Sequence, residues 1–487
     1  MLKTLWKNTP ASVVNKFFYY YLCMVIADLK GLDNLTFLSY MTKQQQAIYD
    51  ARTLGTGKML TLGLQHMFAM FGATVLVPVI TGLSMSATLL FAGLGTLIFH
   101  LLTKLKVPAF LGSSFAFLGG YAAVVVMGSE QGLSAAESLP YACIGVFAAG
   151  LMYFILAGLF AAFGAKKVMR FFPPIVTGPI IIAIGLTLSG SAINNCNQNW
   201  WIALLAMVII IVCNIWGKGM IRIIPILLGV LVSYIVAACF GLCDFSSVKD
   251  AAWVGVPFHW ENTAMHVFQN PNWGLVVSAV IAIVPISLAT MMEHIGDMCA
   301  ISSTTGVNYL EEPGLHRTLM GDGLATMLAS LFGAPANTTY GENTGVLNLT
   351  KVYDPRVIRI AAVFAIILSF CPKFSALIAC MPAAVIGGVS LILYGMISAV
   401  GVRNIVENQV DFTKSRNVII AALILVLAIG ISYSIGSIDL GFTKLSGLAV
   451  AALTGVILNA ILPGKDYEFG ANPQGDKSVD FEVKGHE

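Results

Sequence analysis

Two interrupted apolar segments, Pro108-Ala-Phe-Leu-Gly-Ser-Ser114 and Pro335-Ala-Asn-Thr-Thr-Tyr-Gly341, decide the fold. Each lies in a long hydrophobic stretch, yet its Gly, Pro, Ser and Thr residues make it a poor helix. Inside a membrane, non-helical backbone is tolerated only where protein or a cavity surrounds it. These two segments are therefore the first place to look for a functional site.

The composition around these segments is that of a protein with most of its surface in lipid. The chain has 487 residues, of which 57% are hydrophobic and only 10% are charged, whereas soluble proteins average about 25% charged residues. The mean hydropathy is +0.83. This balance excludes soluble, disordered and disulfide-framework proteins, and no basic stripe indicates nucleic-acid binding.

The hydropathy predicts fourteen membrane spans, because a span needs about 20 mostly apolar residues. The predicted spans cover residues 59–80, 85–103, 107–127, 139–164, 170–189, 200–216, 220–243, 276–300, 319–334, 335–352, 356–372, 376–400, 416–433 and 441–463. The loops on one side carry 14 Lys and Arg residues and the remaining loops only three. The positive-inside rule therefore places both termini in the cytoplasm.

Sequence features recur with a shift of seven spans. The segments at Pro108 and Pro335 fall in spans three and ten, and a Pro-x4-Gly motif opens span five at Pro173 and span twelve at Pro382. Because seven is odd, the two halves must be inverted in the membrane. An all-α polytopic membrane protein with a 7+7 inverted repeat and paired interrupted segments is typical of secondary transporters.

The two ends of the chain are polar. Residues 1–58 and 464–487 are predicted to be a cytoplasmic N-terminal segment and a cytoplasmic tail. The apolar stretch 17–27 is too short to span the bilayer and has no small-residue cleavage site after it. Since Met41 opens a polar stretch that leads into the first span, we expect translation to begin near Met41, with residues 1–40 outside the working protein.

Four acidic residues lie in or beside the predicted spans, where each costs about 2.5–3.5 kcal/mol even on a lenient scale. Glu293 and Asp297 are four residues apart and face one side of span eight. Glu342 is in span ten, and Asp322 is at the start of span nine. Glu293 and Glu342 are interpreted as ligands of a polar substrate, proton carriers, or both. The alternatives are a structural polar pair between helices, and a helix cap for Asp322.

Further candidates are polar or aromatic residues in apolar surroundings, each with a structural alternative. Gln65, His66 and His294 either shape a site or form hydrogen bonds between helices. Phe115, Tyr340 and Tyr394 either line a cavity or fill the hydrophobic core. No metal-ligand spacing, Walker A, GxSxG or HExxH motif is present. We therefore expect no metal, no cofactor, no ATP-driven transport and no enzyme.

These motifs resemble those of the nucleobase–ascorbate transporters, also called nucleobase–cation symporter family 2, and within it the bacterial uracil permeases. The family signature is Gln, Glu or Pro followed by Asn-x-Gly-x4-Thr and then Arg, Lys or Gly. Here it reads Glu342-Asn-Thr-Gly-Val-Leu-Asn-Leu-Thr-Lys351. Similar stretches are Gln65-His66, Gly112-Ser-Ser-Phe115, Glu293-His-Ile-Gly296 and Pro313-Gly-Leu-His-Arg317. The resemblance covers about residues 59–463.

The resemblance implies a core domain (residues 59–169 and 276–375) and a gate domain (residues 170–275 and 376–463). It also implies that spans three and ten each begin as a short strand that crosses its partner. The implied substrate site matches Phe115, Glu293, Gly341 and Glu342, with Tyr340 and Tyr394 nearby and Asn343 in support.

The implied function is proton-coupled uracil uptake by a homodimer in the bacterial plasma (inner) membrane. Glu293 and Glu342 would accept the N–H groups of uracil, and backbone amides near Phe115 and Gly341 would donate to its carbonyls. Glu293 is expected to carry the proton, with Asp297 and Glu342 in support. Asp297 departs from some uracil permeases, which have His there.

Other substrates and activities remain as alternatives. A xanthine or urate carrier usually has Gln at the position of Glu342, and a broader pyrimidine permease is the other choice within the family. An anion carrier would need a cationic site, but no Lys or Arg lies deep in spans three, eight or ten. An intramembrane enzyme could use paired acids, yet a nucleophile or metal constellation is missing.

Overall fold

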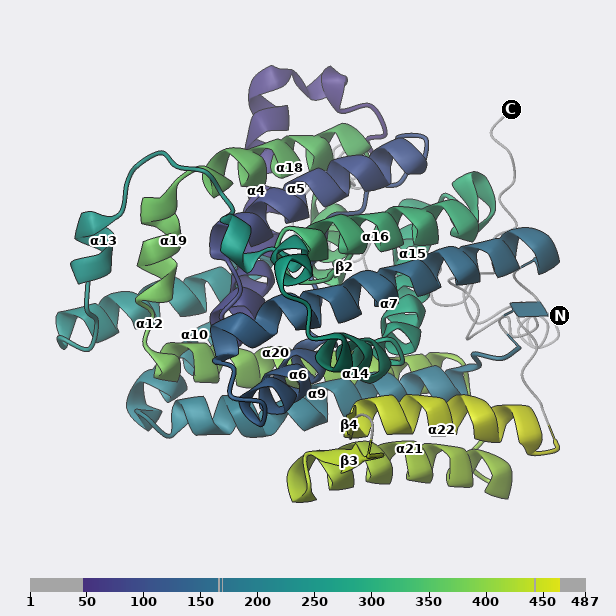
Figure 1. Ribbon diagram of the computed structural model, residues 1–487. Helices are drawn as coiled ribbons and strands as arrows, with labels where there is room; N and C mark the ends of the chain where they lie inside the picture. Colours follow the sequence, from purple (N-terminus) through teal and green to yellow (C-terminus); the bar gives the residue numbers. More distant parts are fainter. Residues whose placement is uncertain (1–46, 165–166, 169, 442–443, 465–487) are drawn as a thin grey trace, which may run out of the picture. The chain divides into compact units, whose positions relative to one another are not determined.

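The computed structural model describes residues 47–164, 167–168, 170–441 and 444–464. The expected start near Met41 and the tail beyond Gly464 lie outside the described residues. The elements below belong to the unit Asp50–Glu487, which is mostly helical (Figure 1).

The elements follow one another along the chain in the following order. The first half contains η1 (Ala51–Leu54), α4 (Thr56–Thr81), α5 (Met85–Leu102), β1 (Leu111–Ser113), α6 (Leu118–Ser129), α7 (Ala135–Phe163), α9 (Pro174–Cys196), α10 (Trp200–Ile215), α11 (Met220–Ile223), α12 (Pro225–Cys239), α13 (Ser246–Asp250), η2 (Trp260–Asn262) and η3 (Ala264–Gln269). The second half contains α14 (Trp273–Ile283), α15 (Ile286–Thr305), η4 (Leu310–Gly314), α16 (Leu315–Leu331), β2 (Asn337–Thr339), α17 (Gly341–Thr350), α18 (Pro355–Ser369), α19 (Pro372–Ala379), α20 (Ala383–Glu407), α21 (Ser415–Ser434), β3 (Ser437–Asp439), β4 (Lys444–Ser446) and α22 (Gly447–Ile461).

The protein is a multi-pass membrane protein. Seven helical segments of the described chain are long and apolar enough to cross a membrane, and α18 with α19, bent by 86°, would make an eighth. Four further apolar helices, α6, α10, α12 and α22, are shorter. Each of the fourteen predicted ranges overlaps one of these helices or α16 or α17.

Proline interrupts the helix in two of the predicted spans. The predicted span 276–300 falls within the apolar segment Trp273–Thr305, which is long enough to cross a membrane as one span. In it, Pro285 separates α14, which ends at Ile283, from α15, which begins at Ile286. The predicted start at residue 376 is wrong, since α19 ends at Ala379 and α20 begins only after Pro382. In both places the proline nitrogen has no hydrogen to donate to the preceding turn.

The helices pack in two groups. In one group α16 packs on α5 and α7, while α18 packs on α4 and α5. In the other, α9 packs on α20 and α21, α10 packs on α12 and α20, and α21 lies beside α22 (Figure 1). Small residues let α9 and α20 approach closely. A methyl group at Gly185 of α9 would lie 2.2 Å from the Tyr394 carbonyl oxygen, and one at Gly401 of α20 would lie 2.6 Å from the Ile182 nitrogen.

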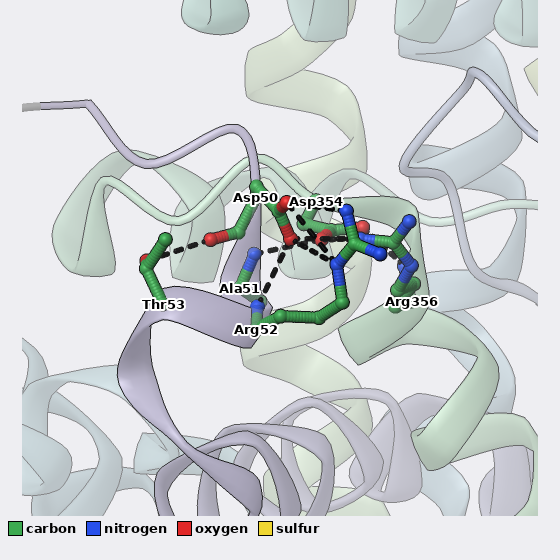
Figure 2. A network of polar contacts seen from close by, with 6 residues as sticks. All are labelled: Asp50, Ala51, Arg52, Thr53, Asp354 and Arg356. Atoms are coloured by element: carbon green, nitrogen blue, oxygen red, sulfur yellow. Dashed lines mark hydrogen bonds and ion pairs between the residues drawn. The ribbon is translucent and has the colours of Figure 1, made fainter.

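A polar network attaches η1 to the loop before α18 (Figure 2). The nearly buried Asp354 carboxylate accepts from the Ala51 N–H at 2.7 Å and from the Arg356 N–H at 2.9 Å. The Arg356 guanidinium donates to Asp354 at 3.0 Å and to Asp50 at 2.9 Å. Arg52 also donates to Asp50, and its hydrogen bonds hold the pKa of the Asp50 carboxyl below its usual range. The network therefore connects η1, which leads into α4, to the start of α18.

Candidate functional site

The two interrupted segments meet as a pair of antiparallel strands. β1 and β2 pair with Leu111 opposite Thr339 and Gly112 opposite Thr338. The ladder is extended by a hydrogen bond from the Tyr340 N–H to the Phe110 carbonyl at 3.0 Å. Both strands are buried, so their backbone groups are satisfied by each other rather than by water.

Each strand leads into a short helix. α6 begins five residues after β1, and α17 begins two residues after β2. Within the described chain, neither helix start has a side-chain cap. At the start of α6 the Leu118 N–H donates to the Phe115 carbonyl at 3.1 Å, and the helix dipoles favour a polar or negatively charged group near both helix starts.

Three of the predicted acids converge at the start of α17. Glu342 is in the first turn of that helix, and α17 packs against α15, which carries Glu293 and Asp297. The start of α17 lies close to α15, since a methyl group at Gly341 would be 3.6 Å from Asp297 Oδ1. Asp297 Oδ2 accepts a hydrogen bond from Thr339 Oγ1 at 2.9 Å. Glu293, Asp297 and Glu342 thus lie on two packed helices beside the strand pair, and we call them the acidic cluster.

Open space adjoins the acidic cluster. Two glycines follow the glutamates by three residues, Gly296 after Glu293 and Gly345 after Glu342. No described atom lies within 4 Å of a Cβ built at either glycine. Since residues three apart share a helix face, the surface beside both glutamates is bare backbone that a flat ligand could approach.

His294 and Asp322 form a pair away from this open surface. His294 Nδ1 lies 3.0 Å from Asp322 Oδ2, and both side chains are completely buried. Thr339 Oγ1 lies 3.5 Å from the same His294 nitrogen. Asp322 lies within α16 rather than at its start, so the structure contradicts the helix-cap alternative. His294 bonds between helices α15 and α16.

His66 and Asn343 connect α4 to α17. The Asn343 side-chain amide donates to His66 Nδ1 at 3.2 Å and to the His66 carbonyl at 3.1 Å. The neighbouring Gln65 is 6% exposed. His66 therefore supports the helix that carries Glu342, through a side chain of the signature motif.

The aromatic candidates occupy two different positions. Phe115, just before α6, meets Tyr394 of α20 edge to face, with ring centroids 5.9 Å apart. This contact joins the two groups of helices. Tyr340 instead turns its hydroxyl towards β1, where it donates to the Ser113 carbonyl at 2.9 Å.

Sequence reasoning missed several residues that build the site. Thr74, Ser113 and Thr339 all bond to site residues, but isolated hydroxyls are ordinary in membrane helices and give no signal. Within the described ranges, no group of three or more His, Cys, Asp or Glu residues could hold a metal ion.

Paired strands that lead into half-helices, with acids between them, define this chain as a membrane transport protein. Its residues 57–437 match the family model Xan_ur_permease, a permease family. The chain belongs to this family, the nucleobase–ascorbate transporters.

Relatives of known name match most of the chain. The uracil permease of Bacillus caldolyticus is 41% identical over 437 residues, which are 87% of this chain and 96% of that protein. The uracil permease of Bacillus subtilis is 40% identical and covers 83% of this chain and 92% of its own length. The putative pyrimidine permease RutG of Escherichia coli is 37% identical over 83% of this chain and 89% of its own.

Solved structures share the fold. The transmembrane domain of the cyanobacterial bicarbonate transporter BicA aligns with a TM-score of 0.55, covering 82% of this chain and 96% of that one, at 14% identity. The anion transporter family member SLC26A9 aligns with a TM-score of 0.57 over 89% of this chain and 69% of its own, at 12% identity.

Proposed function

We propose that the chain is a permease that takes up uracil together with protons. The observation that carries this proposal is the packing of α15, which carries Glu293, on α17, which carries Glu342 in its uncapped first turn. The uracil and pyrimidine permeases similar to this chain along most of its length support the substrate.

The chemistry of uracil suits this cluster. Uracil is a flat ring whose edges alternate N–H donors and C=O acceptors. Glu293 and Glu342 would accept its N–H groups, and the backbone N–H of Gly341 or Phe115 would donate to its carbonyls. Phe115 would stack on the ring, with Tyr394 behind it.

A proton would balance the charge of the loaded site. Two carboxylates that face each other repel when both are ionised, so a proton on one of them stabilises the pair. We assign this proton to Glu293, with Asp297 and Glu342 in support. Uptake would then follow the proton gradient.

We also propose the arrangement of the chain in the membrane. It would cross the bilayer fourteen times as an inverted 7+7 repeat with both termini in the cytoplasm, and β1 and β2 would be the crossing strands of spans three and ten. The helices grouped around α4, α7 and α16 would form a core domain, and those around α9, α20 and α22 a gate domain through which the protein dimerises in a bacterial inner membrane.

Uptake of radiolabelled uracil by permease-deficient cells tests the proposal. Cells that express the chain should accumulate uracil, and a protonophore should abolish accumulation. Thymine, 5-fluorouracil and xanthine serve as competitors. Uptake no higher than in empty cells would overturn the proposal, and stronger competition by xanthine than by 5-fluorouracil would favour a purine permease, the alternative that Glu342 argues against.

A further inference from the structure

We propose that Tyr340 is a positioning residue whose hydroxyl sets the distance between the starts of α6 and α17, and that it makes no hydrogen bond to the nucleobase. The inference rests on the nucleobase site proposed above and assigns to three residues, Tyr340, Thr74 and Ser113, a shared task in it. We call these three residues the strand knot.

The hydroxyl of Tyr340 is already used within the protein. It donates to the Ser113 carbonyl at 2.9 Å and accepts from Thr74 Oγ1 at 3.2 Å. A phenol has one hydrogen to donate, and the Tyr340 side chain is buried. A ligand could obtain this donor only by breaking the bond to β1.

The hydrogen bonds of the strand knot form a closed ring that joins three elements. Ser113 Oγ donates to the Thr74 carbonyl at 2.8 Å, so β1 is attached to α4 by its side chain and to Tyr340 by its backbone. A fully satisfied buried network fixes the positions of its members. Here the members belong to α4, to β1 and to the residue that follows β2.

The knot stands immediately before both half-helices. Ser113 is two residues before Phe115, and Tyr340 is directly before Gly341 and Glu342. The same hydrogen bonds therefore fix the positions of the proposed ligand groups on both sides of the site. A change in the knot would move one side relative to the other.

Gly112 makes room for the Tyr340 ring. A methyl group at Gly112 would lie 2.5 Å from the ring and 2.7 Å from Thr74 Oγ1. Glycine in a strand often marks a place where another group approaches closely. The ring therefore lies over the strand backbone at this residue, which holds Tyr340 in one orientation.

The test compares Tyr340→Phe and Thr74→Val in the uracil uptake assay. Each removes one bond of the knot, and each should raise KM about 3- to 10-fold, as expected for one buried hydrogen bond, with little change in the maximal rate. The double variant should resemble the more severe single variant, because both changes break one network. Thr74→Ser, which keeps the hydroxyl, should restore the wild-type KM.

Matched controls separate the knot from general damage. Thr88→Val removes a buried hydroxyl that bonds only to the Ser84 carbonyl at the start of its own helix, and it should leave KM unchanged. Gly112→Ala should raise KM, whereas Gly158→Ala in α7 should not, because nothing lies within 4 Å of a Cβ at Gly158.

Two results would overturn the inference. If Tyr340 bonds the ligand directly, Tyr340→Phe raises KM and Thr74→Val does not. If neither variant changes KM in a protein that transports uracil, the knot has no positioning role. If the unaltered chain takes up no nucleobase, the proposed function is wrong, and the inference about the strand knot is tested on the purified variants instead. The decrease in melting temperature of the Tyr340→Phe/Thr74→Val double variant should then be smaller than the sum of the decreases of the two single variants.

Discussion

Lys444 of β4 forms an ion pair with Glu130, the residue that follows α6. α6 packs on α7, and β4 packs on α22, so the pair connects an element of the proposed core to one of the proposed gate. Both side chains are partly exposed, and such pairs contribute only about 0–1 kcal/mol. The pair is important because of its position. If the proposed core and the proposed gate move relative to each other, they must separate here.

Crosslinking this position should stop transport. A Glu130→Cys/Lys444→Cys variant, joined by a reducible bis-methanethiosulfonate crosslinker that spans the length of the two replaced side chains, is expected to lose uracil uptake and regain it on reduction, because the crosslink prevents relative movement of α6 and β4. Ser189→Cys/Tyr433→Cys is the matched control, since both residues lie in the α9–α21 pair and their hydroxyls are 2.7 Å apart. The same reagent is applied to the control. Unchanged uptake after complete crosslinking at 130 and 444 would show that this contact stays fixed during transport.

Neutral substitutions of the two glutamates should separate binding from coupling. Glu342→Gln is expected to weaken uracil binding about 10- to 100-fold, as for loss of a hydrogen bond to a charged group. Glu293→Gln should abolish uptake. Glu407→Gln is the control, because Glu407 pairs only with Arg403 at an exposed helix end. Uptake by Glu293→Gln that still depends on pH would exclude Glu293 as the proton carrier.

The Asp50 network predicts a pH dependence of stability. Arg52 holds the pKa of Asp50 below its ordinary value, so the contribution of the Asp50 charge is complete above about pH 5 and is lost as the pH falls below about 4. The melting temperature of Asp50→Asn should therefore be lower than that of the unaltered protein at pH 7, with the difference vanishing in acid. A difference that grows as the pH falls would contradict this assignment.

Removing the close approach of α9 and α20 should destabilise the protein. Gly185→Ala puts a methyl group 2.2 Å from the Tyr394 carbonyl, and overpacking of this kind typically costs about 1–3 kcal/mol. We expect a lower melting temperature and slower uptake. Gly430→Ala in α21 meets nothing within 4 Å and should melt like the unaltered protein. Equal melting temperatures for the two variants would show that the helices can separate at no cost.

Hydrophobicity predicted where the helices are, because apolar length is a local property of the chain. Helices occupy every predicted span. At Pro285 and Pro382 a single proline interrupts the helix, although the mean hydropathy of the surrounding segment is that of a continuous span. The acids Glu293 and Glu342 were conspicuous in the sequence, since charge inside a membrane is costly, and their role in binding stays a prediction.

The contacts between these residues were not predictable in the same way. His294 meets Asp322 and Asn343 meets His66 across large separations in sequence, and neither pairing follows from the spacing of its members. The role of Thr74 depends on a tyrosine 266 residues away. Such contacts appear only when the two halves of the chain are placed against each other.

The pairing of β1 with β2 has a consequence for how the protein is made. The ribosome releases Leu111 long before it releases Thr339, its partner in the ladder. Until then the polar backbone of β1 has no partner strand, and unpaired amides are costly in lipid. Until the second half has been synthesised, the β1 segment must therefore be kept out of the lipid, by the insertion machinery or by water. The two halves of this protein can complete their folding only together.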